Sequence, residues 1–116
     1  MGNIVNSVQL IGNLGDDPEA IYMDSGRVKA TMSIATSEVW YTKDNKKQVH
    51  TDWHNVVAWD RKAEAIEKYC RKGTRVLIDG KLRAETWKDK EGVTRSKTFV
   101  LVNEFLVLDA REEKKE

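Results

Sequence analysis

Hydrophobic and polar residues alternate in several stretches of the chain, which is the pattern of strands with one buried face. The clearest stretch is RVKATMSIATS, in which every second residue is apolar from Val28 onward. The stretch IVNSVQLIGN at residues 4–13 is rich in β-branched and apolar residues and leads into the turn signal GNLG. The stretch TRVLIDGKLR places Val76, Ile78 and Leu82 on one face. Each of these stretches is predicted to be a strand.

A further strand is predicted over residues 52–59, within TDWHNVVAW. Side chains alternate between the faces of a strand, so residues an even number apart point the same way. One face then carries Trp53, Asn55, Val57 and Trp59, and the other carries His54, Val56 and Ala58. Small apolar Val56 and Ala58 suit a core, so the two tryptophans on the opposite face form a candidate platform for a ligand.

One helix and one more strand complete the predicted elements. The helix spans RKAEAIEKYCR at 61–71, with a plausible N-cap at Asp60 and a C-terminal stop at Gly73. Its apolar face is predicted to hold Ala63, Ile66 and Cys70, joined by Ala65 and Tyr69. The last strand, KTFVLVNEFLVL, is apolar on both faces, as expected for a strand covered on both sides. Residues 14–19 and 41–48 are predicted to be loops, DSG a turn, and 84–96 a hairpin.

The order strand, strand, strand, helix, strand, strand is that of the OB-fold, a five-stranded Greek-key barrel with one helix between strands 3 and 4. The fold class is therefore all-β. Residues 1–109 are predicted to form this domain, and residues 110–116 a short, charged, disordered tail. OB-folds commonly bind single strands or oligosaccharides, but the fold alone does not decide the function.

Length and composition exclude several classes of protein. The 116 residues are enough for one domain, and no run of eighteen apolar residues would cross a membrane. The N-terminus lacks the pattern of a signal peptide, so a cytoplasmic location is expected. The single cysteine, Cys70, reads as a buried small hydrophobe, and no metal site or cofactor is expected. Because the net charge is only +1, the charge alone does not indicate a nucleic-acid-binding protein.

Aromatic and basic residues provide the functional signal. None of the four tryptophans occupies an obvious core position, and in an OB-fold they could line one groove: Trp40, Trp53, Trp59 and Trp87. Stacking of a base on an aromatic ring contributes about 1–3 kcal/mol and needs no particular sequence. Basic residues interleave with the tryptophans and could neutralise phosphates: Lys43, Lys46, Lys47, Arg61, Lys62, Arg71, Lys72, Arg83 and Lys88. The acids are expected elsewhere, at Asp16, Asp17, Glu19 and in the tail.

Ordinary structural roles are the alternative for each of these residues. A tryptophan is more often packed than bound to a ligand, and lysine-rich loops are commonly only solvated. His54 points toward the predicted core, where a lone histidine usually serves a core or an interface. No Ser/His/Asp, Cys/His or paired-carboxylate arrangement stands out, so no catalytic residue is predicted and an enzyme is the least favoured class.

Four segments, in this order and with these spacings, identify a family resemblance: NSVQLIGNLGDDPE, ATMSIATSEVW, TDWHNVVAW, and YCRKGTRVLIDGKLR followed by TW. From about residue 4 to residue 108 the sequence resembles the bacterial single-stranded DNA-binding protein family. The resemblance implies an OB-fold that assembles, usually as a homotetramer, and wraps single-stranded DNA. It implies base stacking at Trp40, Trp53, Trp59 and Trp87, with Trp59 where the family commonly has phenylalanine. It also implies that His54 lies at a subunit interface.

The sequence departs from the family's usual pattern in two respects. Positions where basic residues are frequent hold Asn3 and Ser7, then Asn55, then Glu85 and Thr86, so a shallower salt dependence is expected. The chain ends at REEKKE, without the acidic, hydrophobic tip through which cellular members recruit other proteins. A truncated core and a naturally short form from a phage or mobile element both fit this ending, and recruitment through the tail is in doubt.

The sequence therefore predicts a non-enzymatic protein that binds and protects single-stranded DNA in replication, recombination and repair. Two other readings remain open. The chain could be a replication accessory module that mainly contacts protein, or an RNA or oligosaccharide binder on the same fold. Tight, stoichiometric binding to naked poly(dT), and competition among DNA, RNA and sugar polymers, would separate the three.

Overall fold

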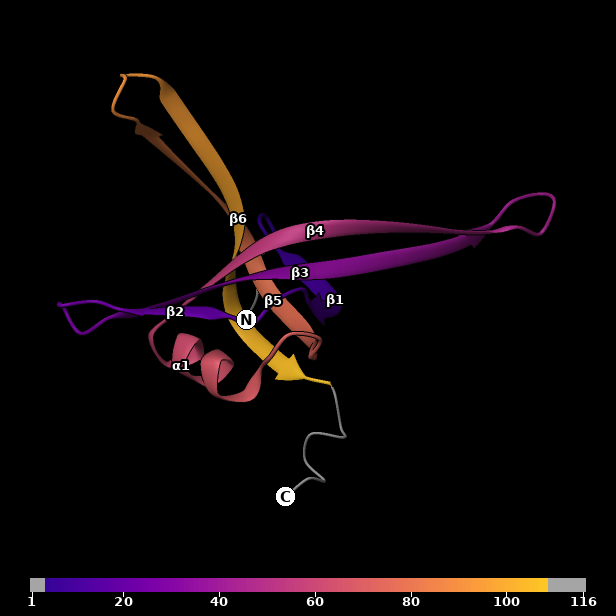
Figure 1. Ribbon diagram of the computed structural model, residues 1–116, viewed down its shortest axis with the longest axis horizontal. Helices are drawn as coiled ribbons and strands as arrows, with labels where there is room; N and C mark the ends of the chain where they lie inside the picture. The colour runs from indigo at the N-terminus through magenta and orange to yellow at the C-terminus, as the bar shows by residue number, and fades with distance from the viewer. Residues whose placement is uncertain (1–3, 109–116) are drawn as a thin grey trace.

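Six strands and one helix make up the described part of the chain, residues 4–108 of a computed structural model (Figure 1). The charged tail predicted over 110–116, the domain's last residue at 109, and Asn3 lie outside the described residues. The elements are β1 (Val8–Leu14), β2 (Glu19–Tyr22), β3 (Val28–Tyr41), β4 (Lys47–Trp59), α1 (Asp60–Tyr69), β5 (Arg75–Lys88) and β6 (Thr94–Val107). No helix among these residues is long and apolar enough to cross a membrane.

Five of the six strands close into a barrel. The sheet runs in the order β1-β5-β6-β4-β3-β2, and β1 also pairs with β3, which closes the ring and leaves β2 outside it. Closure rests on a short antiparallel contact, Asn13 with Ala35 and Leu14 with Ile34. The parallel contact of β4 with β6, through Val56 and Val100, completes the ring. The predicted OB-fold, with its helix between the third and fourth barrel strands, is confirmed.

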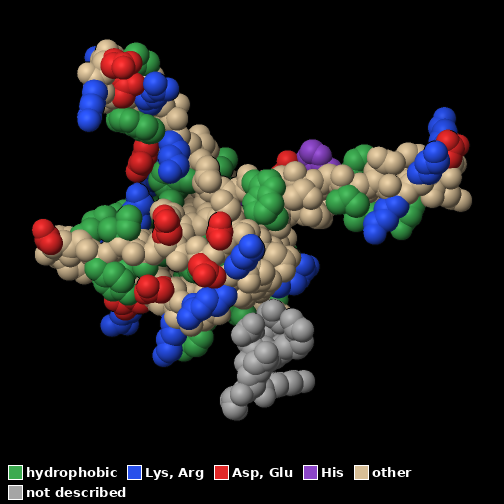
Figure 2. Space-filling model, viewed as in Figure 1, with side chains coloured by type: hydrophobic (Ala, Val, Ile, Leu, Met, Phe, Trp, Pro, Cys, Tyr) green, Lys and Arg blue, Asp and Glu red, His purple; other side chains and the backbone are tan. Residues whose placement is uncertain are grey.

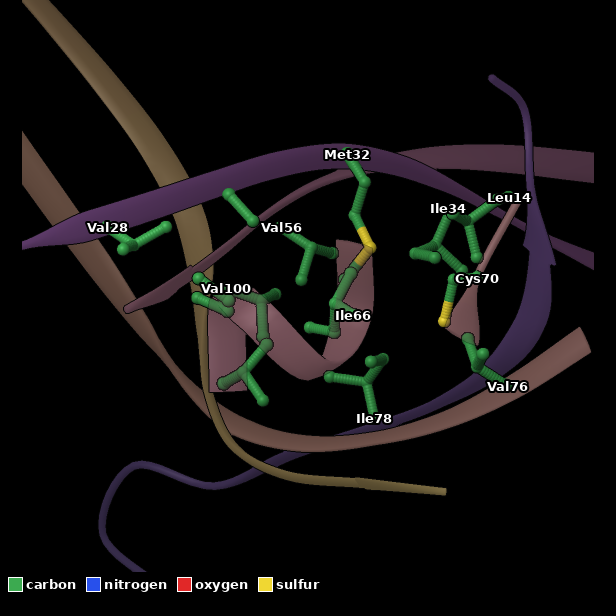
Figure 3. Packing of buried hydrophobic residues seen from close by; sticks show 14 residues of the cluster. Leu14, Val28, Met32, Ile34, Val56, Ile66, Cys70, Val76, Ile78 and Val100 are labelled. Atoms are coloured by element: carbon green, nitrogen blue, oxygen red, sulfur yellow. The ribbon is translucent and has the colours of Figure 1, made fainter. Parts of the chain in front are cut away.

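The core fills the barrel from the strands that alternate most clearly. Val28, Ala30, Met32 and Ile34 on β3 are buried, as predicted, and face Val56 and Ala58 on β4. Helix α1 closes one end of the barrel, and the three residues predicted for its apolar face are fully buried: Ala63 and Ile66 in the helix, and Cys70 directly after it. Figure 3 shows Ile66 and Cys70 within the core. Burial raises the pKa of the Cys70 thiol to about 11, so it stays a neutral, packed side chain.

Two pairs of strands extend beyond the barrel as long arms (Figure 1). The predicted loop 41–48 is shorter than expected, because β3 continues to Tyr41 and β4 begins at Lys47. Hydrogen bonds across this hairpin keep residues paired well past the core, from Ala35 opposite Trp53 to Tyr41 opposite Lys47. The second arm joins β5 to β6, where Trp87 pairs with Arg95.

Several details of the predicted elements are wrong, each for a tertiary reason. The short strand β2 was not predicted; it pairs only with β3 and lies outside the closed ring. Leu82 is half exposed although it pairs with buried Val100, and Tyr69 is also exposed. Strand β6 is covered on both faces only near Phe99 and Val100, whereas Leu106 is 60% exposed.

The helix N-terminus also differs from the prediction. Trp59 occupies the N-cap position without a side-chain hydrogen bond, and Asp60 is the first helical residue. Asp60 has a left-handed φ of 57°, and its carboxylate accepts hydrogen bonds from the Arg27 guanidinium and the Val28 backbone N–H. Asp60 therefore ties the helix to β3 and does not cap its own helix.

Gly12 should be essential for barrel closure. A Cβ at this position would lie 2.1 Å from the carbonyl oxygen of Ala35 on β3. We predict that Gly12→Ala destabilises the protein by about 1–3 kcal/mol, because β1 must move away from β3. Urea unfolding monitored by circular dichroism measures this effect. The control Ser7→Ala, at an exposed residue before β1, should stay within about 0.5 kcal/mol of the parent. If both variants unfold at the same urea concentration, the predicted role of Gly12 in closing the barrel is wrong.

Candidate nucleic-acid interface

The pairing of β3 with β4 sorts their side chains into two faces. Even-numbered residues of both strands point toward the core where the strands form the barrel, and odd-numbered residues form what we call the outer face. On the outer face, Trp59 pairs with Lys29 and Trp53 pairs with Ala35. The structure thus confirms that Trp53 and Trp59 lie on the face of β4 opposite to Val56 and Ala58.

Carboxylates are confined to one side of these strands. Neither strand places an aspartate or a glutamate on the outer face, whereas Glu38 and Asp52 lie on the even-numbered face. Side-chain hydrogen bonds within each face confirm the separation. Ser37 Oγ lies 3.0 Å from Thr51 Oγ1 on the outer face, and His50 Nε2 lies 3.0 Å from Asp52 Oδ1 on the other.

Trp53 lies on the outer face against the loop that joins β1 to β2. Its side chain is 63% exposed, yet a Cβ on Gly15 would lie only 2.3 Å from Trp53 Cζ3. Only glycine leaves room for the ring at this distance. One edge of the Trp53 ring therefore packs on the loop, and most of its surface remains open to solvent.

A cleft of about 530 Å³ opens beside this loop, on the outer face of β3 and β4. Its floor comes from both strands: Thr31, Met32, Ser33, Asn55, Val56 and Val57. Asp16, Asp17 and Glu19 form one wall, and Lys97 of β6 contributes to the lining. The prediction that these acids lie away from the aromatic surface is wrong. The loop bends across the strands, and Asp17 Oδ1 accepts a hydrogen bond of 2.8 Å from the Lys72 backbone N–H.

Trp59 is partly covered by cations of its own chain. The Arg27 guanidinium carbon lies 4.4 Å from the ring centroid, and Lys29 Nζ lies 5.7 Å from it. Arg27 Nη2 also donates to Asp60 Oδ2 at 2.8 Å. This hydrogen bond, helped by the Val28 backbone N–H, holds the pKa of Asp60 below its usual value. The Trp59 ring is therefore fixed by Arg27.

Trp87 lies on the β5–β6 arm, opposite Arg95. Alternation puts Arg83, Glu85 and Trp87 on the same face of β5, with Lys97 opposite Glu85. Arg95 Nε donates to Asp89 Oδ2 at 2.9 Å, which lowers the pKa of Asp89. Lys88, next to Trp87, points to the other face of the arm.

Trp40 does not share a face with Trp53 and Trp59. It is an even-numbered residue paired with Gln48, on the side that carries Glu38 and Asp52. Alternation separates Trp40 from its neighbour Tyr41, and the expectation that all four tryptophans line one groove stays a prediction. A base-stacking role for each tryptophan stays a prediction.

The predicted basic residues divide into an arm group and a helix group. Lys43, Lys46 and Lys47 lie at the tip of the β3–β4 arm, and Figure 2 shows Lys and Arg side chains at the tips of both arms. In the helix group, Lys62 Nζ donates to Glu104 at 3.1 Å, and Arg71 donates to the carbonyl oxygens of Glu67 and Cys70. Arg61 and Lys72 lie at the two ends of the same helix. Roles in phosphate binding stay predictions.

His54 lies on the core side of β4, half-buried. Its Nε2 is 2.9 Å from Thr36 Oγ1, so the ring has a polar partner within its own chain. This contact is compatible with a structural role and with an interface role, and the interface role stays a prediction.

Four further residues lie at this surface without a functional signal in the sequence: Arg27, Lys29, Tyr41 and Lys97. Lys29 was visible as a polar position in the strand from Val28, but its place beside Trp59 depends on which strands pair. Lys97 reaches the cleft only because β6 crosses β4, a contact with no local signal in the sequence. The sequence predicts a loop at Tyr41, and only the pairing of Tyr41 with Lys47 places its side chain on a face of the sheet.

The OB-fold barrel presents an aromatic strand face between an acidic loop and a basic arm. This arrangement is typical of proteins that bind single-stranded nucleic acids. The family model described as "Single-strand binding protein family" matches residues 5–108. The chain belongs to that family.

Individual relatives agree with this result. The chain is 38% identical to Single-stranded DNA-binding protein 1 of Xylella fastidiosa (strain 9a5c) over 110 residues, which is 94% of this chain and 81% of the relative. A solved structure described as Plasmodium falciparum SSB complex with ssDNA superposes with a TM-score of 0.79 and 30% identity, over 94% of this chain and 99% of that chain.

A second solved structure supports the fold alone. It is a deletion mutant of the single-stranded DNA binding protein from Thermus aquaticus, with a TM-score of 0.77 and 23% identity. The match covers 91% of this chain and 51% of that chain.

The Arg27–Asp60 contact should make stability depend on acidity. A carboxyl with a lowered folded-state pKa stabilises the fold above its unfolded-state pKa of about 3.9, and this contribution is lost as the pH falls through the folded-state value. We predict that Asp60→Asn, which removes the charge and tolerates a positive φ, is less stable than the parent at neutral pH. The difference in stability between the parent and Asp60→Asn should disappear in acid. Thermal unfolding at about pH 7 and about pH 2.5 measures it, and an equal difference at both values would contradict the prediction.

Proposed function

We propose that this chain binds single-stranded DNA without sequence preference and protects it in replication, recombination and repair. The observation that carries the proposal is the outer face of β3 and β4, which holds exposed Trp53 and half-buried Trp59 but no carboxylate. The family, and a similar structure whose description names single-stranded DNA, support it. In this proposal the protein is a binding protein without catalytic activity, and it acts in the cytoplasm.

Binding would separate single strands from duplex by differential stacking. A base can lie flat on Trp53 only when it is unpaired and splayed from its neighbours, and each such contact contributes about 1–3 kcal/mol. Because every base has an aromatic face, this contact tolerates any sequence. Paired bases keep their faces covered, so binding stabilises the open strand.

Charge around the cleft would orient the strand. The carboxylates of Asp16, Asp17 and Glu19 repel phosphates from one wall, and Lys97 attracts them to its own position. The sugar-phosphate backbone would therefore run along the Lys97 side, with the bases directed toward Trp53 and the acidic loop. Asn55 lies on the cleft floor and provides an amide instead of a charge.

The number of phosphate contacts should be modest. We propose that the arm residues contact phosphates: Lys43, Lys46, Lys47, Arg83 and Lys88. Lys62 and Arg71 already bond to protein atoms, and they are weaker candidates together with Arg61 and Lys72. Each phosphate contact on a single strand contributes about 0.7 to the slope of log affinity against log salt. A smaller set of contacts gives a shallower slope.

We also propose that the protein assembles with itself, as a homotetramer with His54 at a subunit interface. A row of apolar residues crosses the outside of the barrel, where Ile11 pairs with Leu77 and Leu77 with Leu106. Ile11 and Leu106 are 48% and 60% exposed. Burial of this row against another copy would remove apolar surface from water, and each half-exposed side chain would contribute roughly half of the 1.5–3 kcal/mol that full burial provides. Several linked subunits would raise the avidity for one long strand.

Removal of the Trp53 ring tests the proposed function. We predict that Trp53→Ala weakens binding to poly(dT) by about 1–3 kcal/mol and leaves the unfolding transition cooperative. Fluorescence anisotropy of a labelled strand measures the affinity, with a labelled duplex as the weak-binding reference. Tyr69→Ala, at an exposed aromatic residue on α1, is the control and should bind like the parent. Equal affinities of the parent and Trp53→Ala for poly(dT) would contradict the proposal that Trp53 stacks on bases.

The apolar row predicts a concentration-dependent assembly. Leu106→Ser should shift the protein toward smaller species on dilution, because it removes the most exposed side chain of the row. Sedimentation velocity over a dilution series measures this shift. Ile21→Ser, at a half-exposed residue of β2, serves as the matched control. If both variants sediment like the parent at every concentration, the row is not an interface.

A further inference from the structure

The outer face of β3 and β4 continues past Trp53 to the far end of the arm. We infer that Tyr41 is a third aromatic contact for the strand, and that single-stranded DNA follows this face from the cleft to the arm tip. The inference rests on the proposed function and adds a residue, a path and a choice of face to it.

The spacing of the aromatic residues supports a continuous path. On β4, Trp59 and Trp53 are six residues apart, and Lys47, the partner of Tyr41, lies another six residues along. Six residues of strand span about 20 Å. Tyr41 is 63% exposed, and between it and Trp53 the face carries Val39 paired with Val49.

The side chains between Trp53 and Val49 are small. Trp53 has Ala35 opposite it, and the next pair outward is Ser37 with Thr51, whose hydroxyls bond to each other at 3.0 Å. One hydroxyl donates to the other, which leaves one O–H on this stretch available to solvent or to a bound strand. The resulting low stretch between two raised aromatic positions leaves space for sugars and bases to cross the arm.

Charge separates the two faces of the arm and selects DNA as the occupant. The outer face has Lys47 beside Tyr41 and no carboxylate, whereas the even-numbered face has Glu38 and Asp52. A polyanion is therefore attracted more strongly to the first face than to the second. The outer face of the arm is also continuous with the face that forms the cleft floor. A strand that reaches Trp40 must leave this track and pass around the edge of the arm.

A pair of charge variants at adjacent positions tests the choice of face. Val49→Glu introduces a carboxylate on the outer face, and Gln48→Glu introduces the same charge on the other face, one residue away. Both variants lie on the arm, outside the buried core, and circular dichroism with urea unfolding confirms that each is folded. We expect Val49→Glu to weaken binding to poly(dT) by about tenfold or more, and Gln48→Glu to weaken it several times less.

Tyr41 is tested in the same assay at one fixed salt concentration. Tyr41→Ala should weaken binding about 5- to 150-fold, and Tyr41→Phe, which keeps the ring, should restore most of the affinity. Trp53→Ala is measured beside them as the reference for the proposed function.

Two results would overturn the inference while leaving the proposed function intact. The first is parent-like binding by Tyr41→Ala when Trp53→Ala binds weakly. The second is a Gln48→Glu effect equal to or larger than that of Val49→Glu. Parent-like binding by both Trp53→Ala and Tyr41→Ala would instead remove the proposed function itself.

Discussion

The register of β3 against β4 is the constraint on which the functional surface depends. A shift of one residue would exchange the two faces of a strand, turning the Trp53 side chain toward the core and the Val56 side chain toward the outer face. The core fixes this register, because buried Met32 lies opposite buried Val56. The same packing that holds the barrel together therefore determines which aromatic residues face outward, and it does so over the whole length of both strands.

Barrel closure then brings charges from distant parts of the chain to this face. The loop after β1 reaches the face because Gly12 lets β1 approach β3, and Gly15 leaves room for the Trp53 ring. Lys97 reaches the cleft because β6 pairs with β4. A nearly neutral chain thus presents an acidic wall, an aromatic strand face and basic arms as separate surfaces. This local separation, and not the net charge, suits it to a polyanion.

The sequence allowed the barrel and the Trp53–Trp59 face to be predicted because both depend on a period of two along one strand. It could not show that Tyr41, rather than Trp40, continues that face, since this depends on strands that remain paired beyond the core. The contact of Arg27 with Trp59 and Asp60 joins residues more than thirty positions apart and has no local signal. The resemblance to a family contributed the expected function, which alternation alone would have left as an unspecified ligand platform.

The central claim is that exposed tryptophans on this barrel stack on unpaired bases. Titration of the unmodified protein with poly(dT), and separately with duplex DNA, while recording intrinsic tryptophan fluorescence tests it most directly. Stacked bases should quench the emission strongly and saturably with the single strand, and weakly with the duplex. Little quenching by either, or equal quenching by both, would contradict the account and would mean that the rings of the outer face serve protein contacts.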